Sequence, residues 1–186
     1  MILYPNAKIN LGLNIESKRS DGYHNISSVF YPIYDCFDIL EIVSSNSFLF
    51  TSSGISIPGS NNLCTKAYDL LKLKFNIPAV HIHLHKKIPI GAGLGGGSSD
   101  GAFVLKGLND LFKLNISNKT LKDLALELGA DCPFFIENEP KYITGIGDLM
   151  ENIKLDLSMY EIRLVDSKIH INTKNAYSNI VPKSQK

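Results

Sequence analysis

Five of the 14 glycines in this 186-residue chain fall within seven consecutive positions, 91–97. An alternating, strand-like pattern precedes them, and a helical pattern follows. A loop without side chains permits positive φ and lets a ligand approach the backbone closely. The helix that follows has free N–H groups and a dipole, both of which attract an anion. The segment therefore predicts a strand–loop–helix unit that cradles phosphate rather than a flexible connector.

Two common phosphate-binding motifs overlap this glycine loop, and neither fits. Three of its glycines satisfy G-x-G-x-x-G, but a first Rossmann strand is buried on both faces. The strand here alternates instead, with histidines at 81, 83 and 85 on one face. No acidic residue ends a following strand about 20 residues later, as that fingerprint requires. A P-loop needs lysine at the position of Gly97, so its mechanism is also excluded.

The hydrophobic pattern elsewhere predicts an α+β fold in which helices cover one face of a sheet. Residues 8–15 alternate strictly, with Lys8, Asn10 and Asn14 on the polar face. Strands come first, and helices mix with strands later. We expect further strands at about 26–33, 37–43, 47–51, 79–88, 141–146 and 160–166, and a turn at 20–23. We expect helices from Asn61 or Asn62 to about 75, directly after the glycine loop, at 118–128, and briefly near Thr173.

Composition and charge exclude several classes of protein. With 19 basic and 18 acidic side chains, the net charge of +1 provides no field to attract nucleic acid or anionic lipid. No apolar run approaches the roughly 20 residues of a membrane helix, and the N-terminus does not resemble a signal peptide. The odd number and wide spacing of Cys36, Cys64 and Cys132 oppose a disulfide framework. We expect a soluble cytoplasmic protein.

Two charged residues are candidates for chemistry, although each has an ordinary structural alternative. Lys8 lies on the polar face of the first strand, where most lysines are simply solvated. Asp131 stands among apolar neighbours, either as an N-cap for the segment that begins at Pro133 or as a reactive group. The local sequence favours the cap, and neither residue decides the function alone.

The remaining chemistry-bearing residues favour structural interpretations. The three histidines at 81, 83 and 85 could bind a metal, but no nearby Cys or carboxylate completes a first coordination shell. Lys86 and Lys87 would also repel a cation, so a polar strand face is favoured, and we expect no metal site. Cys132 precedes a proline in apolar company and is expected in the core. No G-x-S-x-G or H-E-x-x-H motif supports a hydrolase.

Three separate segments together resemble one known family. The glycine loop resembles the Pro-x₃-Gly-Leu-Gly-Ser-Ser loop of the galactokinase, homoserine, mevalonate and phosphomevalonate kinase superfamily. Its extra glycines resemble the 4-diphosphocytidyl-2-C-methyl-D-erythritol kinase branch. Two further segments resemble that branch more specifically: Pro5-Asn-Ala-Lys-Ile-Asn-Leu11 with Asp21-Gly-Tyr-His24, and Gly129-Ala-Asp-Cys-Pro-Phe134. The resemblance covers essentially the whole chain.

The resemblance implies a fold and a domain division. The expected fold is a ribosomal protein S5 domain 2-like N-terminal domain, followed by an incomplete C-terminal α/β domain. Residues 1–153 would form the kinase domain with the phosphate loop, and 154–186 would begin the second domain. Family members continue through that second domain, which bears another glycine-rich segment. We therefore expect this chain to be truncated at its C-terminus.

The resemblance also implies a reaction and its residues. The reaction is phosphoryl transfer from ATP, as Mg-ATP, to a hydroxyl of the cytidine diphosphate-methylerythritol, in the non-mevalonate route to isoprenoids. By this analogy Asp131 is the base, and Lys8 sits beside it to hold it ionised and to offset phosphoryl charge. The residues expected at ATP are Pro89, Ile90, Gly91, Ala92, Gly93, Leu94, Gly95, Gly96, Gly97, Ser98 and Ser99, with Asn62 and Lys86 near the adenine. The residues expected at the cytidyl substrate are Asn10, Tyr23, His24, Phe30, Ile146 and Tyr177.

Two alternatives stay open. The truncated chain could bind nucleotide without catalysing a reaction, because a half-built cleft excludes water poorly. The chain could also be a superfamily kinase with another acceptor, such as homoserine or mevalonate. Tyr23 and His24 argue against that option, because an acceptor without a base gives them nothing to bind. The sequence leaves the oligomeric state open.

Overall fold

Two four-stranded sheets carry the fold in the computed structural model, which describes residues 1–58 and 62–165. One sheet has the strand order β1-β4-β6-β5 and the other has the order β2-β3-β7-β8. Neighbouring strands are antiparallel except β5 and β6, which run parallel. The strands are β1 (Ile2–Leu3), β2 (Asn6–Lys18), β3 (His24–Phe37), β4 (Ile39–Ser44), β5 (Leu49–Gly54), β6 (Val80–Lys86), β7 (Lys141–Thr144) and β8 (Leu149–Asn152).

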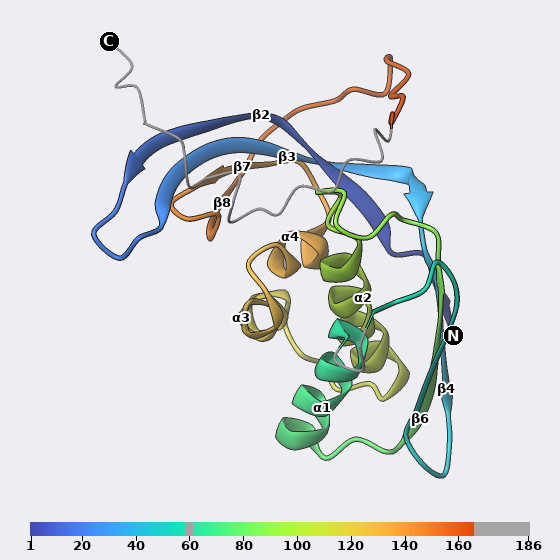
Figure 1. The fold of residues 1–186 in the computed structure, drawn as a ribbon. Helices are drawn as coiled ribbons and strands as arrows, with labels where there is room; N and C mark the ends of the chain where they lie inside the picture. The colour runs from blue at the N-terminus through green and yellow to red at the C-terminus, as the bar shows by residue number, and fades with distance from the viewer. Residues whose placement is uncertain (59–61, 166–186) are drawn as a thin grey trace.

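Within the described residues, four helices fill the angle between the two sheets. They are α1 (Leu63–Phe75), α2 (Gly96–Leu111), α3 (Asn118–Leu128) and α4 (Cys132–Glu137). In Figure 1 they lie together on the inner side of β2 and β3, with β4 and β6 along one flank. Helix α2 contacts both β2 and β4, so it joins the two sheets. The arrangement confirms the predicted α+β fold with helices on one face.

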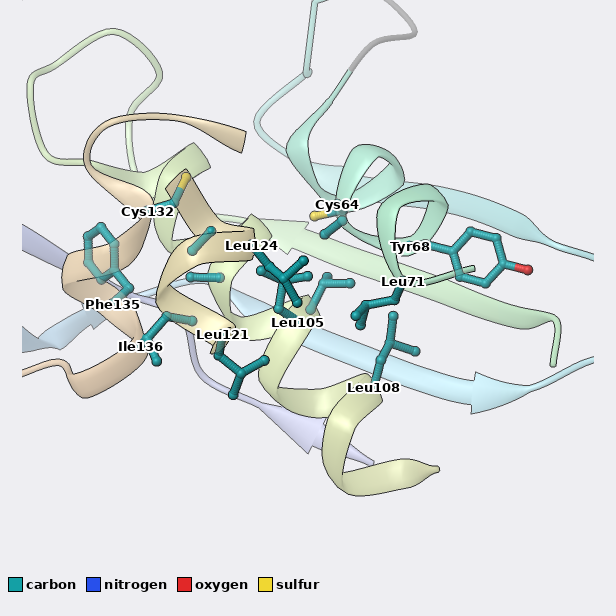
Figure 2. Close-up of a cluster of buried hydrophobic side chains, with 14 of the residues drawn as sticks. Cys64, Tyr68, Leu71, Leu105, Leu108, Leu121, Leu124, Cys132, Phe135 and Ile136 are labelled. Carbon is teal, nitrogen blue, oxygen red and sulfur yellow. The ribbon is translucent and has the colours of Figure 1, made fainter. Parts of the chain in front are cut away.

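A shared hydrophobic core explains why these elements form where they do. Strand β6 alternates strictly, and Val80, Ile82 and Leu84 turn their side chains inward. Figure 2 shows how each helix adds its apolar face to one cluster. The residues labelled there are Cys64, Tyr68 and Leu71 of α1, Leu105 and Leu108 of α2, Leu121 and Leu124 of α3, and Cys132, Phe135 and Ile136 of α4. The expected core position of Cys132 is confirmed, since it is fully buried.

Helix ends follow the signals in the sequence. The side chain of Asn62 caps α1 by accepting a 3.0 Å hydrogen bond from the backbone N–H of Thr65, as predicted. Helix α3 ends at Leu128, and the N–H of Gly129 donates to the carbonyl of Ala125. The φ of Gly129 is 169°, so this glycine is extended and its position does not require a left-handed conformation.

The strand predicted at 160–166 is not found in the part of it that the structure describes. Residues 160–165 form no strand, and no strand in the described part of the chain pairs with them. An alternating pattern makes a strand only where a partner completes its hydrogen bonds, so the prediction of a strand at 160–166 is wrong for these residues. The helix expected near Thr173 lies outside the described residues. Within 1–58 and 62–165, no helix is both long and apolar enough to cross a bilayer.

Candidate active site

The glycine loop turns the chain from β6 into α2 through three left-handed residues. Gly91, Gly93 and Gly95 have φ values of 75°, 75° and 69°. A Cβ on Gly95 would lie 2.9 Å from the ring of Phe135 and 3.0 Å from Cγ of Lys8, so the loop also passes very close to its neighbours. The N–H of Ser99 is the first to bond back, to the carbonyl of Gly95. The N–H groups before it have no intrahelical partner and are available to an anion.

A cleft of about 410 Å³ opens over this loop. Every residue expected at ATP lines it except Ser99, which is fully buried with its Oγ unpartnered. The residues from Pro89 to Ser98 form one wall, and Asn62 and Lys86 contribute from α1 and β6. The structure therefore brings together the strand end, the loop and the helix N-terminus that the sequence linked to phosphate.

Lys8 and Asp131 meet at one end of the loop. The Nζ of Lys8 lies 3.4 Å from Oδ2 of Asp131, 2.6 Å from Oδ1 of Asn10, and 4.3 Å from the centre of the Phe30 ring. Lys8 is only 5% exposed, whereas the Asp131 side chain is 35% exposed. An ammonium held this way is no ordinary solvated lysine, and its carboxylate partner stays accessible to a ligand.

The N-cap interpretation of Asp131 is wrong. Asp131 does stand at the N-cap position of α4, but its side chain makes no capping hydrogen bond. Its backbone is already helical, with φ −83° and ψ −14°, whereas a capping residue is usually extended. The carboxylate turns toward Lys8 on β2 instead. Local sequence could not reveal this partner, because it comes from a remote strand.

A second cleft, of about 1000 Å³, contains the Lys8–Asp131 pair. Gly93 and Gly95 line both clefts, so the two share the glycine loop as a common wall. The second cleft is also lined by five of the residues expected at the cytidyl substrate: Asn10, Tyr23, His24, Phe30 and Ile146. Tyr177 lies outside the described residues. Lining residues that the sequence analysis did not select are Leu13, Lys18, Asp21, Gly22, Ile26 and Gly147.

Comparison with known proteins connects this geometry to a family. Residues 62–139 match the GHMP kinases N terminal domain. The chain is 54% identical over 183 residues to 4-diphosphocytidyl-2-C-methyl-D-erythritol kinase of Azobacteroides pseudotrichonymphae genomovar. CFP2, covering 97% of this chain and 68% of that protein. It is 51% identical to the Cytophaga hutchinsonii protein of the same name, covering 100% of this chain and 70% of that protein. The chain belongs to the 4-diphosphocytidyl-2-C-methyl-D-erythritol kinase family.

A solved structure of this family agrees with the fold. The crystal structure of a 4-(cytidine 5'-diphospho)-2C-methyl-D-erythritol kinase matches with a TM-score of 0.74 and 37% sequence identity. The match covers 84% of this chain and 56% of that one. The prediction of family membership is confirmed, and with it membership of the GHMP kinases, which are ATP-dependent small-molecule kinases.

A buried charged triad lies beneath the loop of this kinase, and two of its members, Asp38 and Asp100, were not predicted from the sequence. The Lys86 ammonium pairs with Asp38 and, at 2.7 Å, with Asp100 of α2. Asp38 also accepts backbone N–H bonds from Lys87 and Ile88, at 2.6 and 2.8 Å. The alternation of β6 could have indicated such a pair. It puts Lys86 on the buried face of the strand, where an ammonium requires a charged or polar partner. Since this amine is engaged by carboxylates, its side chain is turned away from open solvent.

The pKa values of this triad reflect burial and close charges. Burial raises the pKa of Asp100 to about 7, although the Lys86 ammonium acts in the opposite direction. Burial also acts to lower the pKa of Lys86, but the two carboxylates outweigh it and leave that pKa raised. Oδ1 of Asp100 is buried without a hydrogen-bond partner. An unpartnered oxygen in a buried site stabilises the protonated form, in agreement with the raised pKa.

The histidines at 81, 83 and 85 form a hydrogen-bonded ladder on the outer face of β6. Thr51 joins the first two rings, with both contacts at 2.8 Å, and Ser53 joins the last two, both at 2.9 Å. Among the residues the structure describes, no group of three or more His, Cys, Asp and Glu could hold a metal.

Cys132 is not a candidate nucleophile. Burial raises the pKa of Cys132 to about 11, so its thiol is not activated.

Proposed function

We propose that this chain carries the site for ATP-dependent phosphorylation of a hydroxyl of 4-diphosphocytidyl-2-C-methyl-D-erythritol, in non-mevalonate isoprenoid precursor synthesis. One observation carries the proposal: the Lys8–Asp131 pair lies in a cleft whose wall includes two glycines of the phosphate loop. Phosphoryl transfer depends mainly on positioning and charge stabilisation. A carboxylate and an ammonium beside a phosphate cradle are suited to both.

ATP binds in the cleft over the loop, with its phosphates at residues 89–99. The free N–H groups at the start of α2 bond to the phosphate oxygens, and the left-handed glycines let the backbone approach them. Asn62 and Lys86 lie on the adenine side. Because the Lys86 ammonium pairs with Asp38 and Asp100, Lys86 would contact adenine through its main chain. Mg²⁺ would be held by the phosphates of ATP and would offset part of their negative charge.

Asp131 acts as the general base. It accepts the proton of the acceptor hydroxyl as that oxygen bonds to the γ-phosphorus and the bond to ADP breaks. Lys8 orients the carboxylate and offsets negative charge on the phosphoryl oxygens. The geometry supports this division of roles, because the acid is accessible while the amine is buried and held on several sides.

The cytidyl substrate occupies the second cleft. Tyr23 stacks on the cytosine and His24 hydrogen-bonds it, while Asn10, Phe30 and Ile146 line the same pocket. Tyr23 is 62% exposed, so its ring is free to receive a base. We keep Tyr177 in this proposal on the family resemblance alone.

We also propose that residues 1–153 form the N-terminal kinase domain and that 154–186 begin the next domain, since β8 ends at Asn152.

Turnover of the purified chain tests the proposal. We expect ADP and phosphorylated product from Mg-ATP and the cytidyl substrate, and a loss of at least about 100-fold in kcat for Asp131→Asn. The matched control is Asp123→Asn, which changes an exposed carboxylate of α3 that lines neither cleft and should leave kcat unchanged.

Three results would contradict the proposal in different ways. ATP binding without turnover would favour a nucleotide-binding module. Turnover with homoserine or mevalonate, and none with the cytidyl substrate, would identify another acceptor. Wild-type activity in Asp131→Asn would remove the base assignment while leaving the kinase assignment intact.

A further inference from the structure

A chain of three side-chain hydrogen bonds leads from the reactive amine into the centre of the β2–β3 pair. Nζ of Lys8 donates to Oδ1 of Asn10 at 2.6 Å. Nδ2 of Asn10 donates to Oγ of Ser28 at 3.1 Å, and Oγ of Ser28 donates to the carbonyl of Gly12 at 2.6 Å. Lys8, Asn10 and Gly12 belong to β2, and Ser28 belongs to β3. The chain thus crosses between strands before it ends on the backbone.

The final bond fixes the direction of all the others. A hydroxyl has a single proton, and a backbone carbonyl can only accept. Because Ser28 gives its proton to Gly12, its oxygen can only accept from Asn10. The NH₂ group of Asn10 must therefore point to Ser28, which leaves the carbonyl oxygen of its amide toward Lys8. A rotated amide would instead direct its NH₂ group at an ammonium.

The backbone carbonyl is available because β2 is irregular at this point. The register between β2 and β3 shifts between Leu11 and Leu13, and Gly12 stands in the shift with φ 74°. Apart from Gly12 itself and its two chain neighbours, no described residue has an atom within 4 Å of a Cβ built on Gly12, so this glycine is explained by the bulge conformation and not by lack of space. Ser28 is 4% exposed, which protects its bonds from competing water.

We propose that Ser28, acting through Asn10, is a positioning residue that sets the ammonium of Lys8 against Asp131. The proposal rests on the catalytic pair of the proposed function. It also adds to the role expected for Asn10, whose amide orients Lys8 as well as lining the acceptor cleft. The contact between Lys8 and Asp131, at 3.4 Å, is longer than the contact of the same amine with Asn10, at 2.6 Å, so its geometry depends on how the amine is held by Asn10.

The test removes the hydroxyl of Ser28 and compares its neighbour on the other face of β3. Ser27→Ala is the matched control, because Ser27 is also buried but bonds Glu16 and Asn14 rather than Asn10. Ser28→Thr keeps the hydroxyl and serves as the rescue variant. The readouts are the ¹H–¹⁵N signal of the Lys8 ammonium, the KM and kcat for both substrates, and the unfolding midpoint.

We expect Ser28→Ala to shift or broaden the Lys8 ammonium signal and to lower kcat about tenfold, with the KM for ATP within about twofold of wild type. Ser27→Ala should keep both the signal and kcat, and Ser28→Thr should restore both. An unchanged Lys8 signal in a folded Ser28→Ala protein would overturn the proposal. Equal losses in Ser27→Ala and Ser28→Ala would also overturn it, because they would indicate a general effect on the sheet.

The two proposals fail separately. If the wild-type chain shows no turnover, the proposed function fails, and the ammonium signal still decides whether Ser28 orients Lys8. If wild-type turnover is present and neither the signal nor kcat responds to Ser28→Ala, the positioning role alone fails.

Discussion

The environment of several charged side chains is set by partners that are distant in sequence. Lys8 contacts an amide, a carboxylate and an aromatic ring, and only the amide is local. Asp38, between β3 and β4, and Asp100, on α2, share one ammonium. Family resemblance was enough to select Lys8 and Asp131. The two partners of Lys86 were missed because pairing across a fold leaves no local pattern.

Tyr23 provides a test of acceptor recognition at this scale. Tyr23→Ala should weaken binding of the cytidyl substrate by about 1–3 kcal/mol, because base–aromatic stacking contributes roughly that much. ATP affinity should stay nearly constant, since Tyr23 lines only the second cleft. Calorimetric titration with each ligand measures both affinities. Tyr160→Ala is the control, because Tyr160 is exposed and lines neither cleft, and a parallel loss there would refute specific stacking.

At the level of elements, segments with a visible pattern were predictable, including the short strand β7 within the expected 141–146. The alternation of β2 and β6 and the Asn62 cap of α1 are local properties, and each appears as expected. No periodic pattern marks strand β8 or helix α4, so their positions depend on packing. The strand expected at 160–166 had the pattern but found no partner within the described residues.

Two glycines of the loop, one left-handed and one helical, form a matched pair for testing the backbone conformation of the loop. Gly95→Ala should destabilise the fold by about 1–3 kcal/mol, because φ is 69° and a Cβ would meet Phe135 at 2.9 Å. Gly97→Ala should be neutral or stabilising by up to about 1 kcal/mol, because Gly97 is helical and a Cβ there has open space. Urea unfolding of both variants measures the difference. Equal stabilities would show that the loop has no special conformation to protect.

For the whole molecule, the Asp38–Lys86–Asp100 triad links the sheet to the helical layer and ties stability to pH. Asp100 has a pKa of about 7 in the fold, against an ordinary value of 3.8. The folded state therefore holds this proton more tightly than the unfolded state does. The stability that Asp100 contributes is fully present below about pH 4 and is lost as the pH rises to about 7.

Asp100→Asn removes this titration. We compare the free energy of unfolding of wild type with that of the variant. The difference, wild type minus variant, should decrease as the pH rises from about 4 to about 7, by at most about 1.4 kcal/mol per pH unit. It should stay constant above that range. Denaturant unfolding across the pH range measures it, with Asp123→Asn as the exposed control. A difference that stays flat or rises over this interval would mean that Asp100 is ionised throughout.

The main chain adds one more connection between the two clefts. The N–H of Lys8 donates to the carbonyl of Leu94 at 2.9 Å, so strand β2 is tethered to the glycine loop. Because this bond joins the two backbones, a displacement of the loop at Leu94 would act on β2 at Lys8. Any coupling of binding that this hydrogen bond transmits between the two clefts is reciprocal, so each ligand changes the affinity of the other by the same factor.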